Sequence, residues 1–113
     1  MKVLITKRFE KEYLKKLTKY LSKNDLVKIL NNKSHILISL HDPFFKFKNK
    51  INLVDFRGVI AIIENEVIVP LYVYLKKGKK NGENVSWKNQ QDLIEIEFDL
   101  NTKDIENGNY EIY

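Results

Sequence analysis

The chain of 113 residues contains no cysteine, one alanine and only two arginines. The absence of cysteine excludes a disulfide scaffold, a zinc site with cysteine ligands and a cysteine nucleophile. No apolar run approaches the roughly 18 residues of a membrane span, so the sequence predicts no transmembrane helix. The N-terminal apolar run, Val3-Leu4-Ile5, is too short for a secretory signal. We therefore expect a cytoplasmic protein, and the length predicts a single domain over residues 1–113.

Charge is divided unevenly along the chain, which carries a formal net charge of +5. Residues 1–80 hold 18 basic and 7 acidic side chains, a net charge of +11. Residues 81–113 hold 2 basic and 8 acidic side chains, a net charge of −6. The first part is typical of a surface for a polyanion. The acidic C-terminal extension, 81–113, has two interpretations. Residues 92–99 lie across or beside the basic face as an internal anion mimic, or they form an acidic sheet edge that discourages aggregation.

Helical periodicity follows a short N-terminal strand. Apolar residues recur at helical spacing from Phe9 to Leu21, which predicts an amphipathic helix of about four turns. Thr6 is the expected N-cap of this helix. A second helix is predicted over residues 26–30, after cap-type residues at 22–25. The short break between the two helices predicts an αα-hairpin.

Strand patterns dominate the middle of the chain. Residues 46–51, 56–63 and 66–75 are strand-like, and residues 35–40 fit a buried strand or an extended connection equally well. A hairpin turn is expected between the two longer strands, with positive φ at Asn65. Further along the chain, Pro70 predicts an edge position or a bulge, because proline cannot donate to the ladder.

The acidic segment also shows a strand pattern. Apolar residues alternate with acidic ones from Ile94 to Leu100, and residues 110–112 fit a returning strand after a turn at Asn107-Gly108. The sequence therefore predicts an α+β fold: an N-terminal strand and an αα-hairpin packed on a small antiparallel sheet, in the order β-α-α-β-β-β, with an acidic β-type C-terminal extension.

Basic residues mark the candidate site. Lys48 and Lys50 share one face of a strand because side chains repeat with period two, and Lys46 extends that row. Arg57 begins the next strand-like segment, and Lys77 follows the end of the one after it. A β-meander brings these cations together on one face without a local counter-ion, where they can stabilise negative charge developing at a phosphate. The alternative is a solvated lysine-rich face.

The same residues resemble a known family. The pair Lys48-Asn49-Lys50, the dipeptide Phe56-Arg57 seven residues after Lys50, and the basic Lys77 twenty residues after Arg57 resemble the RelE branch of the RelE/ParE superfamily of toxins. Residues 1–17 resemble the first strand and helix of that family, and residues 57–69 resemble its central hairpin. The resemblance covers roughly residues 1–80.

The resemblance implies the toxin of a toxin–antitoxin pair, a ribosome-dependent mRNA endonuclease that uses the nucleotide 2′-hydroxyl and needs no metal or cofactor. Lys48 and Lys50 then activate the 2′-hydroxyl or hold the phosphate, Arg57 stabilises the phosphorane-like charge, and Lys77 helps the 5′-oxygen leave. The implied partners are a cognate antitoxin protein, mRNA and the ribosome, with no membrane. Further candidates for RNA binding are Lys46, Lys76, Lys79, Lys80 and Trp87.

Two departures from the family pattern keep a second hypothesis open. Lys77 stands where the RelE branch usually has arginine, which binds phosphate differently. The tyrosine expected about six residues later is replaced by Glu83. The second hypothesis is a non-catalytic protein of the same fold, either a ParE-like gyrase inhibitor or an inactive homologue that binds nucleic acid or antitoxin. Tyr72 and Tyr74, alternate residues of one strand, are weak candidates for the same surface.

Overall fold

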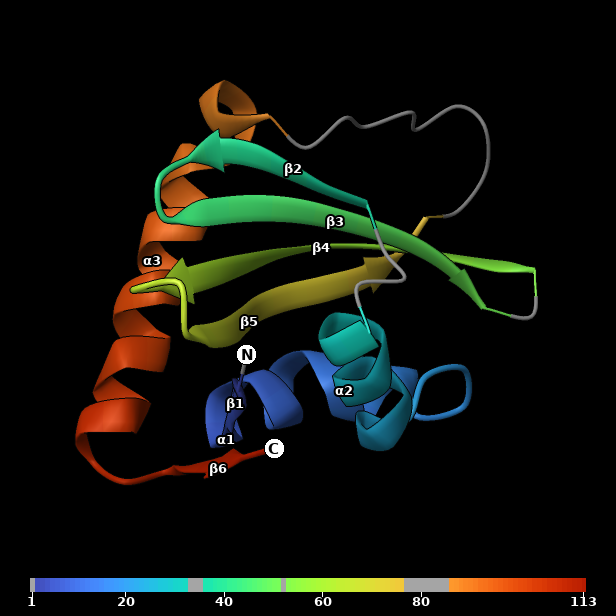
Figure 1. Ribbon diagram of the computed structural model, residues 1–113, viewed down its shortest axis with the longest axis horizontal. Helices are drawn as coiled ribbons and strands as arrows, with labels where there is room; N and C mark the ends of the chain where they lie inside the picture. The colour runs from blue at the N-terminus through green and yellow to red at the C-terminus, as the bar shows by residue number, and fades with distance from the viewer. Residues whose placement is uncertain (1, 33–35, 52, 77–85) are drawn as a thin grey trace.

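Six strands form one sheet, with helical segments against both faces, in the computed structural model of the chain (Figure 1). The structure describes residues 2–32, 36–51, 53–76 and 86–113. The strands are β1 (Lys2–Thr6), β2 (Ile36–His41), β3 (Phe44–Ile51), β4 (Val54–Ile63), β5 (Val67–Leu75) and β6 (Tyr110–Ile112). Their order in the sheet is β2-β3-β4-β5-β1-β6.

The helical segments are α1 (Lys7–Phe9), η1 (Glu10–Leu14), η2 (Lys15–Leu17), α2 (Lys23–Asn32) and α3 (Trp87–Glu106). The first three are consecutive, so the first helix is shorter than predicted and changes from α to π to 3₁₀ geometry. Thr6 caps it as expected, since its hydroxyl accepts a hydrogen bond from the Phe9 N–H at 3.0 Å. No described helix is long and apolar enough to cross a membrane.

The sheet is mixed, so the prediction of a purely antiparallel sheet is wrong. Strands β3, β4 and β5 form the expected antiparallel meander, and β2 resolves the ambiguity over residues 36–40 by pairing with β3. Strand β1 pairs parallel with β5 through Lys2↔Val67 and Val3↔Ile68. The helical pair carries the chain from β1 to the far edge of the sheet, and the meander returns to β1 through a strand that runs in the same direction.

Two irregular positions lie in the β4–β5 hairpin. Glu64 and Asn65 have φ of 53° and 58°, the left-handed conformation that a tight hairpin turn requires, as expected for Asn65. The register changes from Val59↔Tyr72 to Ile60↔Pro70, which places Pro70 at a bulge. The bulge prediction is confirmed, but the edge alternative is wrong because β5 lies between β4 and β1.

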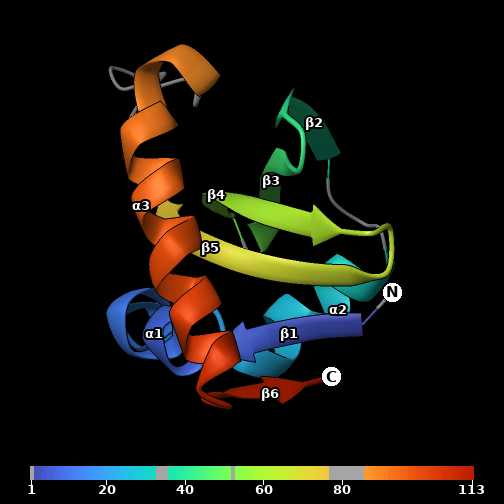
Figure 2. The same ribbon diagram turned by 90° about the vertical axis from the view of Figure 1, so that its left-hand side faces the viewer.

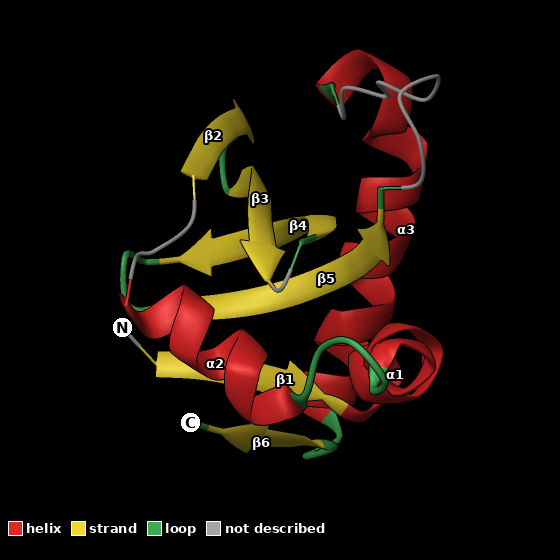
Figure 3. Cartoon of the chain, turned by 90° about the vertical axis from the view of Figure 1, so that its right-hand side faces the viewer, coloured by secondary structure: helices red, strands yellow, loops and turns green. Residues whose placement is uncertain are grey.

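Two apolar clusters lie on opposite faces of the sheet. On one face, Phe47 and Phe56 pack with Leu26 of α2, which lies in front of the sheet in Figure 3. On the other face, Val59 and Tyr72 pack with Ile94 of α3, which crosses in front of β5 and β1 in Figure 2. We call this second surface the α3 face.

The acidic C-terminal segment forms a helix and not the predicted strand. Ser86 caps α3 by accepting a hydrogen bond from the Asn89 N–H at 3.2 Å. The buried residues of α3 are Ile94, Glu97 and Asn101, which share one helical face. Because two of these three are polar, the apolar residues do not show the helical period. After α3 the chain forms β6, which supplies the expected strand but pairs with β1.

Candidate functional site

The basic residues of β3 and β4 lie on the α3 face. Lys48 pairs with Arg57, and Lys46 pairs with Val59, whose side chain packs on the α3 face. Directly opposite residues of an antiparallel pair project to the same side, and alternate residues of a strand share a side. Lys50, two residues after Lys48, therefore projects to the same side as Arg57.

Strand β5 extends this arrangement with an aromatic residue and another lysine. Tyr74 pairs with Arg57, so Lys48, Arg57 and Tyr74 form one row across three strands. The Lys76 N–H donates to the Asp55 carbonyl at 2.9 Å, which places Lys76 beside Asp55 in the next row. Together these strands and the residue after β5 carry five cations on one side of the sheet. We call them the cationic face: Lys46, Lys48, Lys50, Arg57 and Lys76.

Asp55 gives the cationic face a local counter-ion. Arg57 Nη1 lies 3.2 Å from Asp55 Oδ1 and also donates to the Phe56 carbonyl at 3.1 Å. The expectation of cations without a local counter-ion is therefore wrong for Arg57. The period of two along β4 already places Asp55 on the same side as Arg57. The contact fixes the guanidinium and lowers the net charge of the cationic face.

Other predicted site residues lie elsewhere. Lys77, Lys79 and Lys80 fall outside the described residues. Trp87 stacks on His41, with ring centroids 4.5 Å apart, and on Phe44 at 5.6 Å. Phe44 begins β3, whereas Lys48 and Lys50 lie toward its other end, so Trp87 is not brought together with Arg57. Its stacked, half-buried position indicates packing between α3 and the sheet.

Helix α3 leaves the cationic face open. Figure 1 shows α3 at the left end of the strands, whereas β3 and β5 end and β4 begins at the right. The exposed acids Asp92, Glu95 and Asp99 project from α3, and in the part of the chain that the structure describes none forms an ion pair with the cationic face. Because residues 92–99 form a helix toward the opposite end of these strands, they do not lie across the cations and they are not an acidic sheet edge.

A buried carboxylate connects α3 to the first helix, and sequence reasoning missed it. The Glu97 side chain is only 4% exposed. Arg8 Nε and Nη2 donate to its two oxygens at 2.9 Å each, and the Tyr13 hydroxyl donates at 2.6 Å. The hydrogen bond to Glu97 raises the pKa of Arg8, while burial and the same carboxylate raise the pKa of Tyr13. Because Arg8 and Glu97 are 89 residues apart, no local sequence pattern predicts their contact.

Amide and hydroxyl groups complete this connection. The Asn101 side-chain amide donates to the Glu97 carbonyl at 2.7 Å, and the Thr6 hydroxyl forms a hydrogen bond with Asn101 Oδ1. The Arg8 N–H donates to Asp104 Oδ2 at 2.7 Å. Every polar group named here has a partner, which satisfies the requirement for burying such groups. The network therefore has a structural role.

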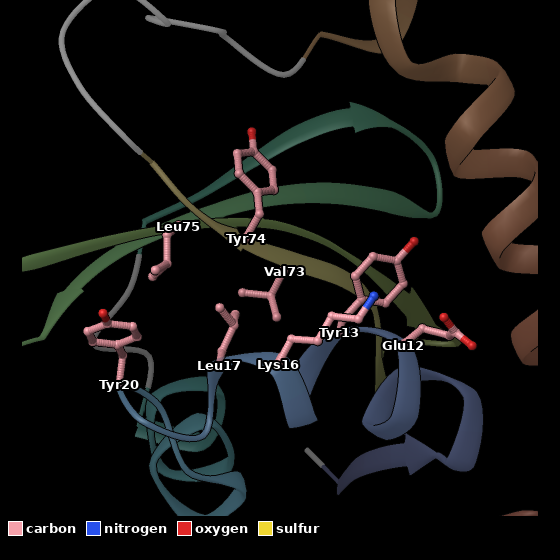
Figure 4. A pocket seen from close by; sticks show the side chains of 8 residues that line it. All are labelled: Glu12, Tyr13, Lys16, Leu17, Tyr20, Val73, Tyr74 and Leu75. Carbon is pink, nitrogen blue, oxygen red and sulfur yellow. The ribbon is translucent and has the colours of Figure 1, made fainter.

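Two clefts border the first helical segment. One has a volume of about 490 Å³ and lies between this segment and the second half of β5 (Figure 4). It includes Tyr74, so it adjoins the cationic face. The other, of about 550 Å³, lies on another side of the segment. Its lining residues are Lys7, Glu10, Lys11, Leu14, Lys15, Thr18 and Lys23.

Comparison with protein-family models, curated proteins and solved structures finds no match for the chain. The chemistry of the site therefore follows from its own geometry. Adjacent cations on neighbouring strands suit the oxygens of a phosphate, and arginine presents a planar set of donors to them. Tyr74 adds an aromatic ring at the end of the Lys48–Arg57 row. The combination suits a phosphodiester with an attached base.

Proposed function

We propose that the chain is the toxin of a toxin–antitoxin system, an endoribonuclease that cleaves mRNA within the ribosome without a metal ion. The observation that carries this proposal is the pairing of Lys48 with Arg57 on one sheet face, with Lys46, Lys50 and Lys76 around them. The resemblance of residues 1–80 to the RelE branch supports it. The strand, helical pair and meander along the chain also support it.

In this proposal the reaction is an attack by the RNA's own 2′-oxygen on the adjacent phosphorus. The 2′-hydroxyl loses its proton as the new P–O bond forms, and the bond to the 5′-oxygen breaks as that oxygen gains a proton. Lys48 and Lys50 activate the hydroxyl or hold the phosphate, and Arg57 stabilises the charge on the phosphoryl oxygens. Lys77 is assigned the leaving oxygen from the sequence resemblance alone.

A non-catalytic role is the second candidate. The observation that favours it is the Arg57–Asp55 ion pair, because a guanidinium held by a carboxylate is less available to a phosphate. Lys77 in place of arginine and Glu83 in place of tyrosine favour it as well. In this alternative the cationic face binds nucleic acid or an antitoxin without cleavage, or the chain inhibits gyrase.

The partner proposed in either case is a cognate antitoxin in the cytoplasm. Its contact with the cationic face would require acidic or hydrogen-bond-accepting groups, because that face carries five cations and a single described acid, Asp55. An antitoxin that covers Lys48 and Arg57 would block RNA at the same time. Copurification of the product of a neighbouring small gene tests this partner.

Mapping of cleavage sites by primer extension after induction tests the nuclease. We expect growth arrest and discrete mRNA breaks in cells, and cleavage by purified protein on programmed ribosomes. Changing both Lys48→Ala and Arg57→Ala should abolish cleavage. The matched control, Lys28→Ala with Lys103→Ala, removes two positive charges from exposed helix positions outside the site and should leave cleavage intact.

Three outcomes would contradict the proposal. Cleavage that survives the Lys48/Arg57 double change rules out the assigned roles. Growth arrest without mRNA breaks, accompanied by altered DNA supercoiling, supports the gyrase-inhibitor alternative. Binding of RNA without breaks or growth arrest supports the inactive homologue.

A further inference from the structure

We propose that the cleft between the first helical segment and β5 holds a base of the RNA strand whose phosphates contact the cationic face. This inference rests on the proposed function, since it requires that the chain binds single-stranded RNA. It adds a base-binding site to the phosphate-binding row.

The cleft exists because β1 accompanies β5 over only part of its length. The registered pairs between β1 and β5 are Lys2↔Val67 and Val3↔Ile68. Beyond them, η1 and η2 lie beside the second half of β5. The cleft is lined by Glu12, Tyr13, Lys16, Leu17, Tyr20, Val73, Tyr74 and Leu75 (Figure 4). Its volume of about 490 Å³ falls in the range of roughly 300–1,000 Å³ found for small-molecule sites.

The lining suits a flat aromatic ligand. Val73 and Leu17 lie at the centre of the lining in Figure 4, with Tyr13 and Tyr20 on either side of them. The Tyr74 ring points away from Val73, toward the side of the cationic face. Tyr74 stacks on Tyr72 with ring centroids 6.3 Å apart, and Tyr13 lies 6.0 Å from the same ring. Tyr72 is buried and packs beside both rings. Aromatic side chains of this kind bind the faces of bases without regard to sequence.

The cationic face fixes the class of ligand. Tyr74 lies directly across from Arg57, and Arg57 lies directly across from Lys48. The backbones of Lys48 and Tyr74 are therefore two strand spacings apart, about 10 Å. A strand with its phosphates on Lys48 and Arg57 can place the neighbouring base against Tyr74. An uncharged ligand bound against Tyr74 would gain nothing from the neighbouring charges of Arg57 and Lys48.

Charge at the rim is also compatible with RNA. Lys16 adds a cation to the cleft, and the Glu12 carboxylate points away from Leu17 and Val73 in Figure 4. The centre of the lining therefore presents apolar and aromatic groups, which favour stacking over reading of the base edge. We expect little preference among the four bases at this position.

The test compares RNA with and without bases. The probes are a 2′-O-methyl oligoadenylate hexamer, which has no free 2′-hydroxyl to attack, and an abasic hexamer of the same length and charge. The native chain should bind the oligoadenylate about tenfold more tightly, because stacking adds to the phosphate contacts. Fluorescence anisotropy of end-labelled probes measures both affinities.

Variants identify the residues that cause the preference for RNA with bases. Tyr74→Ala should abolish it, while Tyr20→Ala, at a side chain that is 43% exposed and not needed for the core, should reduce it. Neither change should weaken binding of the abasic hexamer. Tyr113→Ala, an exposed tyrosine on the far side of β1, is the matched control and should change neither affinity. Lys48→Ala should weaken binding of both probes equally.

The outcomes separate this inference from the proposed function. If Lys48→Ala weakens both probes but Tyr74→Ala and Tyr20→Ala leave the preference for bases unchanged, the base site is wrong and the phosphate-binding row stands. The same result would be expected if the open edge of β5 held an extended peptide. If the native chain binds neither hexamer, the base site is wrong, whereas the nuclease proposal fails only if mRNA on programmed ribosomes is not cleaved.

Discussion

The Arg8 guanidinium meets both oxygens of the Glu97 carboxylate, Nε to Oε1 at 2.9 Å and Nη2 to Oε2 at 2.9 Å. The two residues are 89 positions apart in the chain. Their contact joins the start of the first helix to the middle of α3. Because Glu97 also accepts from Tyr13, one carboxylate organises the packing of two helices that no loop holds together.

Removal of this carboxylate should destabilise the fold. Glu97→Ala leaves the Arg8 guanidinium and the Tyr13 hydroxyl without their acceptor in a largely buried site. We expect a loss of about 2–4 kcal/mol in the free energy of unfolding, since removing one partner of such a pair leaves the other uncompensated. Urea unfolding followed by circular dichroism measures it. Glu95→Ala, at an exposed position of the same helix, should cost less than about 0.5 kcal/mol. Equal losses would mean that the network contributes nothing specific.

Ionisation of two tyrosines should make the fold sensitive to high pH. Burial raises the pKa of both Tyr13 and Tyr72, and the Glu97 hydrogen bond raises that of Tyr13 further. Their protonated forms are favoured in the folded chain, so this contribution to stability is complete below about pH 10, where unfolded tyrosine titrates. It should be lost as the pH rises above that value.

Unfolding curves between pH 8 and pH 11, in roughly half-unit steps around the tyrosine pKa, measure this dependence. Tyr13→Phe removes one of the two groups and should flatten the fall in stability above pH 10, about the value for a free tyrosine. An unchanged fall would show that other groups carry it.

Gly58 should not tolerate a side chain. An added Cβ would lie 2.5 Å from Cε1 of Phe47 and 2.6 Å from the Tyr72 carbonyl oxygen. Gly58→Ala must displace the buried Phe47 ring or β5, and we expect a loss of about 2 kcal/mol in stability. Thermal unfolding measures it. Gly108→Asn is the matched control, because its φ of 75° suits asparagine and no atom lies within 4 Å of an added Cβ. A Gly58→Ala protein as stable as the native chain would mean that the close approach to Phe47 is not tight.

Neutralising Asp55 should strengthen RNA binding. Asp55→Asn removes the negative charge beside Arg57, so phosphates meet a more positive face. We expect about threefold tighter binding of single-stranded RNA at low salt, a typical effect of one partly exposed charge. Glu66→Gln makes the same change in net charge at the turn between β4 and β5 and should have a smaller effect. Weaker binding by Asp55→Asn would instead mean that the carboxylate holds Arg57 in its productive position.

The meander and the grouping of its cations were accessible from the sequence because both depend on a local period of two. Lys46, Lys48 and Lys50 alternate along one strand, and a short hairpin at Asn65 sets the partner strands beside it. The parallel pairing of β1 with β5 was not accessible, since it depends on how the helical pair crosses the sheet. The sequence predicts a strand in place of α3 because Glu97 and Asn101 occupy buried positions where apolar residues would have shown the helical period.

The period of two along the strands also predicts part of the candidate site. The strand pattern places Arg57 beside Lys48. It also places Asp55 on the same side of β4 as Arg57, yet the sequence prediction of cations without a counter-ion did not include this ion pair. The cleft beside Tyr74 requires the three-dimensional position of the first helix. No pattern within one segment reports on such a contact.

The bulge at Pro70 decides which side chains of β5 share a surface with Arg57. Before it, Val69 faces the α3 side, and after it Tyr72 does, although these two residues are an odd number of positions apart. A regular strand would have turned Tyr72 and Tyr74 toward the opposite face. Deleting one residue of the bulge would leave Val69 and Tyr72 two positions apart, so a regular strand would then keep both on the α3 side. The bulge thus absorbs the one residue that would otherwise turn the aromatic side of β5 away from Arg57.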